Sequence, residues 1–425
     1  MITNFATAAL SAARRQKLSL LLMATLLAVL SSPASADVLT VGLNGGQYAS
    51  IQQAADAALD GDVLLLMDET FAGATLTNKG ITLVADAGSS PRILGDLTVE
   101  NLAPDKSCVL SGITITSGFS PVTGNVFAAS LNLESNAGAV FVENCSILGA
   151  GWPAGVTVRF CSAVSFVDCT LTGGSGFDCD DATLCSAGDG AKGLFVRASQ
   201  VAIEGCTAEG GQGGSYTGDS SGVPANGGRG GDAVDVRSGT VHIADGSLTG
   251  GTGGGPNCTP LGGCGSTGLN GYAVVLGSPS AVVSLRDLTL ASSISNFAGG
   301  SLVTYPSMAR RLRGSAPVRE GETLTLTFEG EQGDLLSLWL SFDAGWISLP
   351  ARQGVFQLGF PLAIPVGLGL GALPASGTIT LDLTVPPLPT GVEGFPLLMQ
   401  GLFVSPSEGA LLSNPTATVL LSAAF

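Results

Sequence analysis

A short pattern of apolar and polar residues recurs between residues 108 and 290. Each copy holds two stretches in which apolar residues alternate with polar or small ones, the period-two pattern of a β-strand. Between the two stretches the alternation slips by one residue, so the chain must bend there. The copies run from Cys108 to Ile115, Val140 to Ile147, Val164 to Leu171, Val201 to Ala208, Val241 to Leu248 and Val283 to Leu290.

The residue at the bend is of one kind in every copy. It is Gly, Asn or Asp, which are the residues that most readily adopt a left-handed backbone. We therefore expect a sharp turn at each of these positions, with a strand on either side. The bend residues are Gly112, Asn144, Asp168, Gly205, Asp245 and Asp287.

A further strand precedes three of the copies, over Val156–Arg159, Leu194–Arg197 and Val234–Arg237. The shortest distance between bends fits three short strands and three turns. A strand–crossover–parallel strand connection is almost always right-handed, and stacked coils pair their backbone groups with neighbours about 4.8 Å away. The sequence therefore predicts an all-β fold, a right-handed parallel β-helix. The longer distances carry glycine-rich insertions, expected to be floppy surface loops that bury little, at residues 173–190, 210–231 and 250–271.

The N-terminal part of the repeat region resembles bacterial pectate-lyase-like β-helix proteins. The resemblance lies in Gln47–Ala54, which continues to Val63, and in Gly80–Leu83. Ser50 and Gln53 have the spacing of a capping box, so a short helix is expected from Ile51 to Leu59, covering the open end of the core. The resemblance covers about residues 37–303. It implies the architecture of that superfamily and no single activity.

The repeat stops near Tyr305. Residues 306–317 form a basic linker that contains Arg310, Arg311 and Arg313. Short alternating strands separated by Gly and Pro then predict an antiparallel β-sandwich over residues 318–425, similar in pattern to accessory domains of secreted bacterial proteins. The expected strands are 323–328, 335–342, 378–385, 397–404 and 417–421.

Residues 1–36 have the pattern of a signal peptide. A basic segment is followed by an apolar run over residues 18–30 and by Ala34-Ser35-Ala36, a small-residue cleavage site. We expect a mature chain that begins at Asp37 and is secreted or held at the cell surface. Residues 37–305 then form the β-helix.

The net charge of the chain limits the classes of molecule that it is expected to bind. Removal of the leader takes away three basic residues and no acidic one, which changes the formal net charge from −16 to −19. Such a chain repels nucleic acid and anionic membranes. The mature sequence also lacks a run of eighteen apolar residues, so we expect no membrane insertion. A polysaccharide or a cell-surface glycan remains the expected partner, and the oligomeric state is left open.

Nine cysteines in an exported chain predict disulfides in part. Cys179 and Cys185 flank five residues, as do Cys258 and Cys264, and each pair would staple a glycine-rich insertion. A second set occupies one inward position in three consecutive copies. These residues are expected to be a core stack of small apolar side chains, and they are Cys145, Cys169 and Cys206.

The insertions also hold candidate metal ligands. Asp178, Asp180, Asp181 and Asp189 crowd one of them and could bind Ca²⁺ through their oxygen atoms. The alternative is a set of solvated turn carboxylates. Residues 227–234 match one calcium-binding nonapeptide, which alone supplies half a site. No other cofactor is expected.

Two candidates for acid–base or nucleophilic chemistry are weak. His242, the single histidine, should be an exposed residue on the outer face of a strand. Residues 218–222 match the G-x-S-x-G pattern, but in a glycine-rich loop rather than in a strand–turn–helix elbow.

Arg159, Arg197 and Arg237 should stack as a ladder, since each ends an equivalent strand. Like charges so close cost energy unless acids such as Asp235 or Glu204, or an anionic ligand, lie among them. The preferred hypothesis is an exported non-catalytic β-helix protein that acts as a surface, adhesive or matrix component and binds glycans. The alternative is a polysaccharide lyase or glycoside hydrolase acting on an anionic polysaccharide, as the pectate-lyase-like resemblance would allow.

Overall fold

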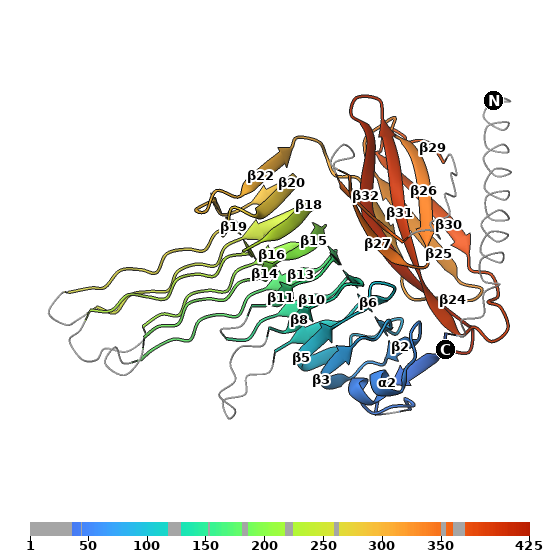
Figure 1. Ribbon diagram of the computed structural model, residues 1–425, viewed down its shortest axis with the longest axis horizontal. Helices are drawn as coiled ribbons and strands as arrows, with labels where there is room; N and C mark the ends of the chain where they lie inside the picture. The colour runs from blue at the N-terminus through green and yellow to red at the C-terminus, as the bar shows by residue number, and fades with distance from the viewer. Residues whose placement is uncertain are drawn as a thin grey trace.

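The computed structural model is nearly all β, and one large sheet of parallel strands dominates it (Figure 1). That sheet spans residues 38–305, here called the parallel-sheet region. Smaller, mainly antiparallel sheets occupy residues 311–421, here called the C-terminal region. The structure describes residues 36–43, 45–117, 129–151, 154–180, 186–216, 224–258, 263–349, 354–359 and 370–425.

The parallel pairings form three columns, in which each strand lies between its equivalents in the preceding and following repeats. Column 1 contains β1 (Val38–Val41), β2 (Val63–Leu66), β4 (Thr82–Ala85), β6 (Ser107–Ser111), β9 (Ala139–Glu143), β12 (Ala163–Val167), β15 (Ser199–Glu204), β18 (Gly239–Thr249), β20 (Ala281–Leu290) and β22 (Ser301–Tyr305). Column 2 contains the first parts of β3 (Thr70–Thr77) and β5 (Arg92–Glu100), then β7 (Thr114–Thr116), β10 (Ser146–Leu148), β13 (Thr170–Thr172), β16 (Thr207–Glu209) and the last parts of β18 and β20. Column 3 contains the last parts of β3 and β5, then β8 (Leu131–Glu134), β11 (Val156–Arg159), β14 (Leu194–Arg197), β17 (Val234–Val236), β19 (Val274–Leu276) and β21 (Ile294–Ser295). The arrangement is compatible with a β-helix.

The predicted bends lie between columns 1 and 2. All six bend residues have a positive φ, between 49° and 73°. The expectation of a left-handed backbone at each position is therefore confirmed, and the phase slip in the sequence marks a real change of direction.

Apolar side chains from all three columns fill the interior, among them Val164, Phe166 and Val196. The helix α2 (Ile51–Ala57) covers one end of this core, since Ile51 and Ala54 are buried against it. The Ser50 hydroxyl accepts a hydrogen bond from the Gln53 backbone N–H at 3.2 Å, as the capping-box spacing predicts. The helix ends at Ala57, two residues earlier than expected.

The three glycine-rich insertions form an ordered slab, so the expectation of loose loops was wrong. We call residues 173–193, 210–233 and 250–273, where described, the glycine slab; each segment runs outward and returns (Figure 1). Neighbouring outward segments are joined by backbone hydrogen bonds, such as Gly176 N–H to the Gln212 carbonyl at 2.7 Å. Outward and returning segments are joined as well, for example by Gly211 N–H to the Ala191 carbonyl at 2.7 Å.

The physical reason is a backbone-to-backbone contact between the two layers of the slab. A Cβ atom on Gly210, in an outward segment, would overlap the carbonyl oxygen of Gly231 in a returning segment, and one on Gly230 would overlap that of Gly251. Larger residues are tolerated where the chain faces solvent, at Ser175, Gln212 and Thr252. Glycine therefore acts here as a packing residue rather than as a flexible one.

The C-terminal region contains three sheets. The first has the order β23 (Arg311–Gly314), β25 (Thr323–Glu329) and β30 (Thr378–Thr384), and the second is β24 (Val318–Arg319), β32 (Gly409–Leu421), β31 (Gly394–Ser405), β26 (Leu335–Ser341) and β29 (Gly371–Ala372). The third pairs β27 (Ala344–Leu349) with β28 (Gly354–Leu358). Strand β23 lies within the segment predicted to be a linker.

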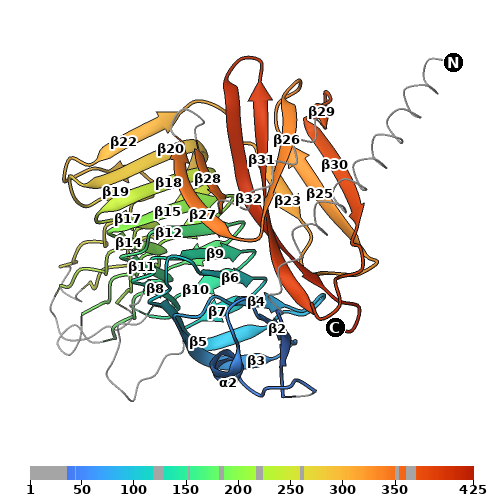
Figure 2. The same cartoon turned by 45° about the vertical axis from the view of Figure 1, so that its right-hand side comes forward.

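The C-terminal region packs on the outer face of column 1 (Figure 2). Phe141 and Val167 of column 1 meet Phe356 and Leu398 of the C-terminal region in one apolar cluster. Strands β9 and β12 of column 1 are thus buried on both of their faces. Within the described residues, no helix is both long and apolar enough to cross a membrane.

Candidate functional site

Basic side chains gather along the outer side of column 3. Arg159 of β11 lies opposite Arg197 of β14, and Arg237 directly follows β17, so the predicted arginine ladder is one continuous row. Lys192 and Arg229 lie on returning segments of the glycine slab that lead into β14 and β17. We call these five residues the basic face.

Aromatic rings separate the charges of the basic face. The guanidinium carbon of Arg159 lies 5.7 Å from the centre of the Phe195 ring, and Lys192 Nζ lies 5.8 Å from it. Arg197 lies 5.7 Å from the Phe160 ring centre in the same way. Because a ring face attracts a cation, these contacts offset part of the repulsion between the stacked charges.

Two acids neutralise only part of the basic face. The buried Asp235 carboxylate accepts hydrogen bonds from Arg237 at 2.9 and 3.1 Å, and Lys192 Nζ lies 3.5 Å from it. Asp232 pairs with Arg229 at 2.7 Å. Pairing with acids, the alternative weighed for the ladder, therefore holds at Arg237. Among the described residues, the ion pairs include neither Arg159 nor Arg197.

An open groove of about 420 Å³ runs beside the arginine row. It is formed by the turns that lead from column 3 to column 1. The ring of Phe160, which is half exposed, forms one side, and Ser162, Gln200 and Thr240 contribute polar groups. A cation row, an exposed ring and polar side chains thus lie along one solvent-accessible surface.

The arginines of the predicted linker have a different role. Arg311 pairs with Asp168 and Asp245, and Arg313 Nε lies 3.9 Å from Asp168 Oδ2. These contacts join the C-terminal region to the parallel-sheet region. The positive charge of the predicted linker is therefore paired with acids of the same molecule.

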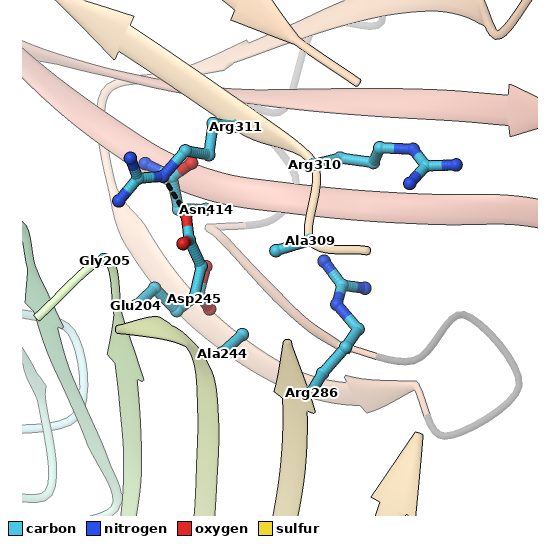
Figure 3. Close-up of a pocket in the computed structure, with 9 residues that line it drawn as sticks. All are labelled: Glu204, Gly205, Ala244, Asp245, Arg286, Ala309, Arg310, Arg311 and Asn414. Atoms are coloured by element: carbon cyan, nitrogen blue, oxygen red, sulfur yellow. Dashed lines mark ion pairs between the residues drawn. The ribbon is translucent and has the colours of Figure 1, made fainter. Parts of the chain in front are cut away.

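The junction between the two regions contains a cavity of about 10 Å³, room for about one water molecule (Figure 3). Glu204, Asp245 and Arg286 reach it from the parallel-sheet region, and Arg311 points toward Asp245 from the other side. Its size fits an internal water rather than a ligand.

The expectation for His242 was wrong. Its side chain does point away from the interior of the parallel-sheet region, but it is buried beneath the C-terminal region, and Nδ1 lies 2.8 Å from the Ser284 hydroxyl. Burial, with a smaller effect of Arg286, lowers the pKa of His242 to about 3. The neutral ring has no path to solvent in this arrangement.

Column 1 carries two buried acids, of which sequence reasoning missed Glu143 and misplaced Glu204. Glu143 accepts hydrogen bonds from the Thr416 hydroxyl at 2.6 Å and from the Ala417 N–H at 2.8 Å. Glu204 accepts one from Gln357 at 2.9 Å and so is no partner of the arginine ladder, contrary to the suggestion above. Burial raises the pKa of each carboxyl to about 8. A usable signal was present, since strands such as β9 are apolar at outward as well as inward positions.

The predicted calcium ligands are spread along the glycine slab. Asp178 accepts a hydrogen bond from the Ser215 N–H and Asp189 one from the Arg229 N–H, each at 2.7 Å. Asp180 lies in the same segment, whereas Asp181 lies outside the described residues. No three His, Cys, Asp or Glu side chains gather as a metal site within the described part of the chain. The calcium site stays a prediction.

The cysteine expectations are confirmed where they can be followed. Cys258 and Cys264 form a disulfide, and Cys179 is disulfide-bonded, while Cys185 lies outside the described residues. The predicted core stack is buried and carries free thiols at Cys145, Cys169 and Cys206. The G-x-S-x-G segment at residues 218–222 also lies outside the described residues.

Comparison with known proteins adds no family. No protein-family model matches the chain, and no curated protein matches it either.

Proposed function

We propose that the chain is an exported right-handed parallel β-helix protein with a C-terminal β-sandwich, and that it binds anionic glycans without catalysing their cleavage. The observation that supports this proposal is the composition of the basic face. Five of the basic residues of a strongly acidic chain lie there, together with Phe160 and Phe195. Such a surface attracts a polyanion and offers apolar rings to the faces of sugar rings.

Binding is favoured over catalysis because of where the titratable groups lie. Acid–base catalysis needs a group with a pKa near the working pH within reach of the substrate. Glu143 and Glu204 have raised pKa values but are sealed under the C-terminal region. The groove beside the arginine row is lined by hydroxyl, amide and ring groups, and the Cys161 thiol there is buried, which raises its pKa.

The test is a binding measurement with polygalacturonate and alginate, and with a neutral glucan as reference. We expect weak binding of the two polyanions that falls as salt is added, because screening acts on the attraction directly. Arg197→Ala should lower the affinity by about tenfold, the effect of one lost hydrogen bond to a charged group.

The matched control is Arg92→Ala, which removes an exposed arginine from column 2 and should leave binding unchanged. Binding insensitive to both salt and Arg197→Ala would remove the basic face from the proposal. Release of unsaturated products or reducing ends that Arg197→Ala abolishes would favour the alternative, a polysaccharide lyase or glycoside hydrolase.

A further inference from the structure

The two ends of the parallel-sheet region are covered differently. At the first, α2 lies over the core and buries Ile51 and Ala54. At the second, β22 pairs with β20 and, within the described residues, with no other strand. Figures 1 and 2 show no described element beyond β22. One edge of β22 therefore presents backbone N–H and C=O groups to solvent.

Apolar side chains are exposed at the same end. We call the last repeat, residues 281–305, the open end. Five large apolar side chains there are at least 38% exposed: Val282, Leu290, Phe297, Leu302 and Val303. Exposed apolar side chains near an unpaired strand edge are typical of a surface that is covered in the working protein.

Most of the open end is also free of charged residues. The 18 residues from Leu288 to Tyr305 contain no Asp, Glu, Lys or Arg, in a chain whose formal net charge is −16. Two copies of so acidic a chain repel one another over most of their surface. Here that repulsion is weakest.

The edges of the glycine slab provide a contrast. Two backbone N–H groups of its last segment are satisfied by side chains, since Gly253 N–H donates to Asn270 Oδ1 at 2.9 Å and Gly250 N–H donates to the Ser292 hydroxyl at 3.0 Å. The open end has no such side-chain cap on β22 among the described contacts. The unpaired edge of β22 therefore differs from the edge of the slab, because no described side chain satisfies its backbone groups.

We propose that the open end is the interface of a homodimer, in which β22 of one copy pairs antiparallel with β22 of a second copy. Two identical strands related by a two-fold axis satisfy each other's backbone groups, and the same axis brings exposed apolar side chains of both copies to one interface. Because α2 closes the opposite end, association stops at two copies and does not continue into a fibre. The interface is small, so a concentration-dependent dimer is expected.

The test is sedimentation velocity of the full chain over a wide range of concentration. We expect a monomer–dimer equilibrium. Phe297→Lys and Val303→Lys should each shift it toward monomer by at least tenfold in dissociation constant, because each places paired positive charges across the two-fold axis.

Leu43→Lys is the matched control, since Leu43 is 72% exposed at the capped end and Phe297 is 78% exposed. Thermal melting of each variant at low concentration verifies that the fold is retained. A chain that stays monomeric at every concentration, or a dimer that the two open-end variants leave intact while folded, would overturn the proposal. Species larger than a dimer would also contradict it.

Discussion

The repeats of the parallel-sheet region and the glycine slab stack in the same direction but are held together differently. In the repeats, side chains such as Phe166 and Val196 fill the space between columns. In the slab, glycines such as Gly210 and Gly231 bring the backbone of one layer against the backbone of the other. The repeats therefore show apolar and polar residues that alternate with a period of two. In the slab, glycine occupies the positions where two backbones meet, and larger residues occur where the chain faces solvent.

This difference sets what stabilises each part. Buried apolar surface contributes roughly 25 cal/mol per Å², so the repeats have an independent source of stability. A backbone hydrogen bond contributes only about 1 kcal/mol net, and each glycine loses more conformational entropy on folding than any other residue. The slab should thus depend on the repeats that anchor it, while the repeats should not depend on the slab.

The largest effect is expected from Phe166→Ala. This change leaves a cavity in the core, and we expect a loss of about 3–5 kcal/mol in the free energy of unfolding. Denaturant unfolding followed by circular dichroism measures it. The paired variant Phe177→Ala removes a ring that is 44% exposed on the slab and should cost only about 0.5 kcal/mol. Equal losses would mean that the slab and the repeats unfold as one unit.

The second effect is expected from Gly231→Ala, whose Cβ would overlap the Ala191 carbonyl oxygen. We expect neighbouring segments of the slab to separate locally at a cost of about 1–3 kcal/mol, with faster amide exchange at residues 210–216 and 224–233. The core thiol of Cys206 should stay protected from alkylation, because the repeats persist.

Gly255→Ala is the control, since its Cβ would lie 3.6 Å from the nearest atom, the Ser215 hydroxyl oxygen. It should leave exchange in the slab unchanged. If Gly231→Ala instead exposed Cys206 to labelling, the slab would be required for the repeats and the distinction drawn here would be wrong.

The sequence predicted the repeats better than the slab for a physical reason. A phase slip at Asn144 or Asp168 has one simple interpretation, because few residues tolerate a positive φ. A run of glycines is compatible with both a loose loop and a close backbone contact, and only the neighbouring segment decides between them. The equivalent spacing of glycines in three insertions was the signal that could have favoured the contact.

The candidate site was predictable to a similar extent. Strand alternation placed Arg159, Arg197 and Arg237 on one row, and the structure retains that row. Alternation also predicted that the His242 side chain points outward. It did not predict that this side chain is buried under the C-terminal region, because a strand pattern does not say what packs on its outer face. Lys192 and Arg229 belong to the basic face only because the glycine slab is ordered, and the sequence did not predict this order.

A pH-dependent effect belongs to the covered face of the repeats. The carboxyls of Glu143 and Glu204 have pKa values raised from 4.5 to about 8 by burial. Because the folded pKa is above the unfolded one, the contribution to stability is fully present below about pH 4.5 and is lost as the pH rises through 8. Each group should change the free energy of unfolding by about 1 kcal/mol per pH unit within that window.

Glu143→Gln separates this effect from the rest of the molecule. The amide keeps a carbonyl oxygen for the Ala417 N–H and carries no ionisable proton, so the decline between pH 5 and 8 should become shallower. Unfolding by urea at several pH values measures it, with the exposed Glu209→Gln as control. A decline of unchanged slope in Glu143→Gln would show that the junction with the C-terminal region opens before the repeats unfold. Glu143 would then already be ionised in contact with water before the repeats unfold. The C-terminal region would be separable from the repeats, as the slab is expected to be.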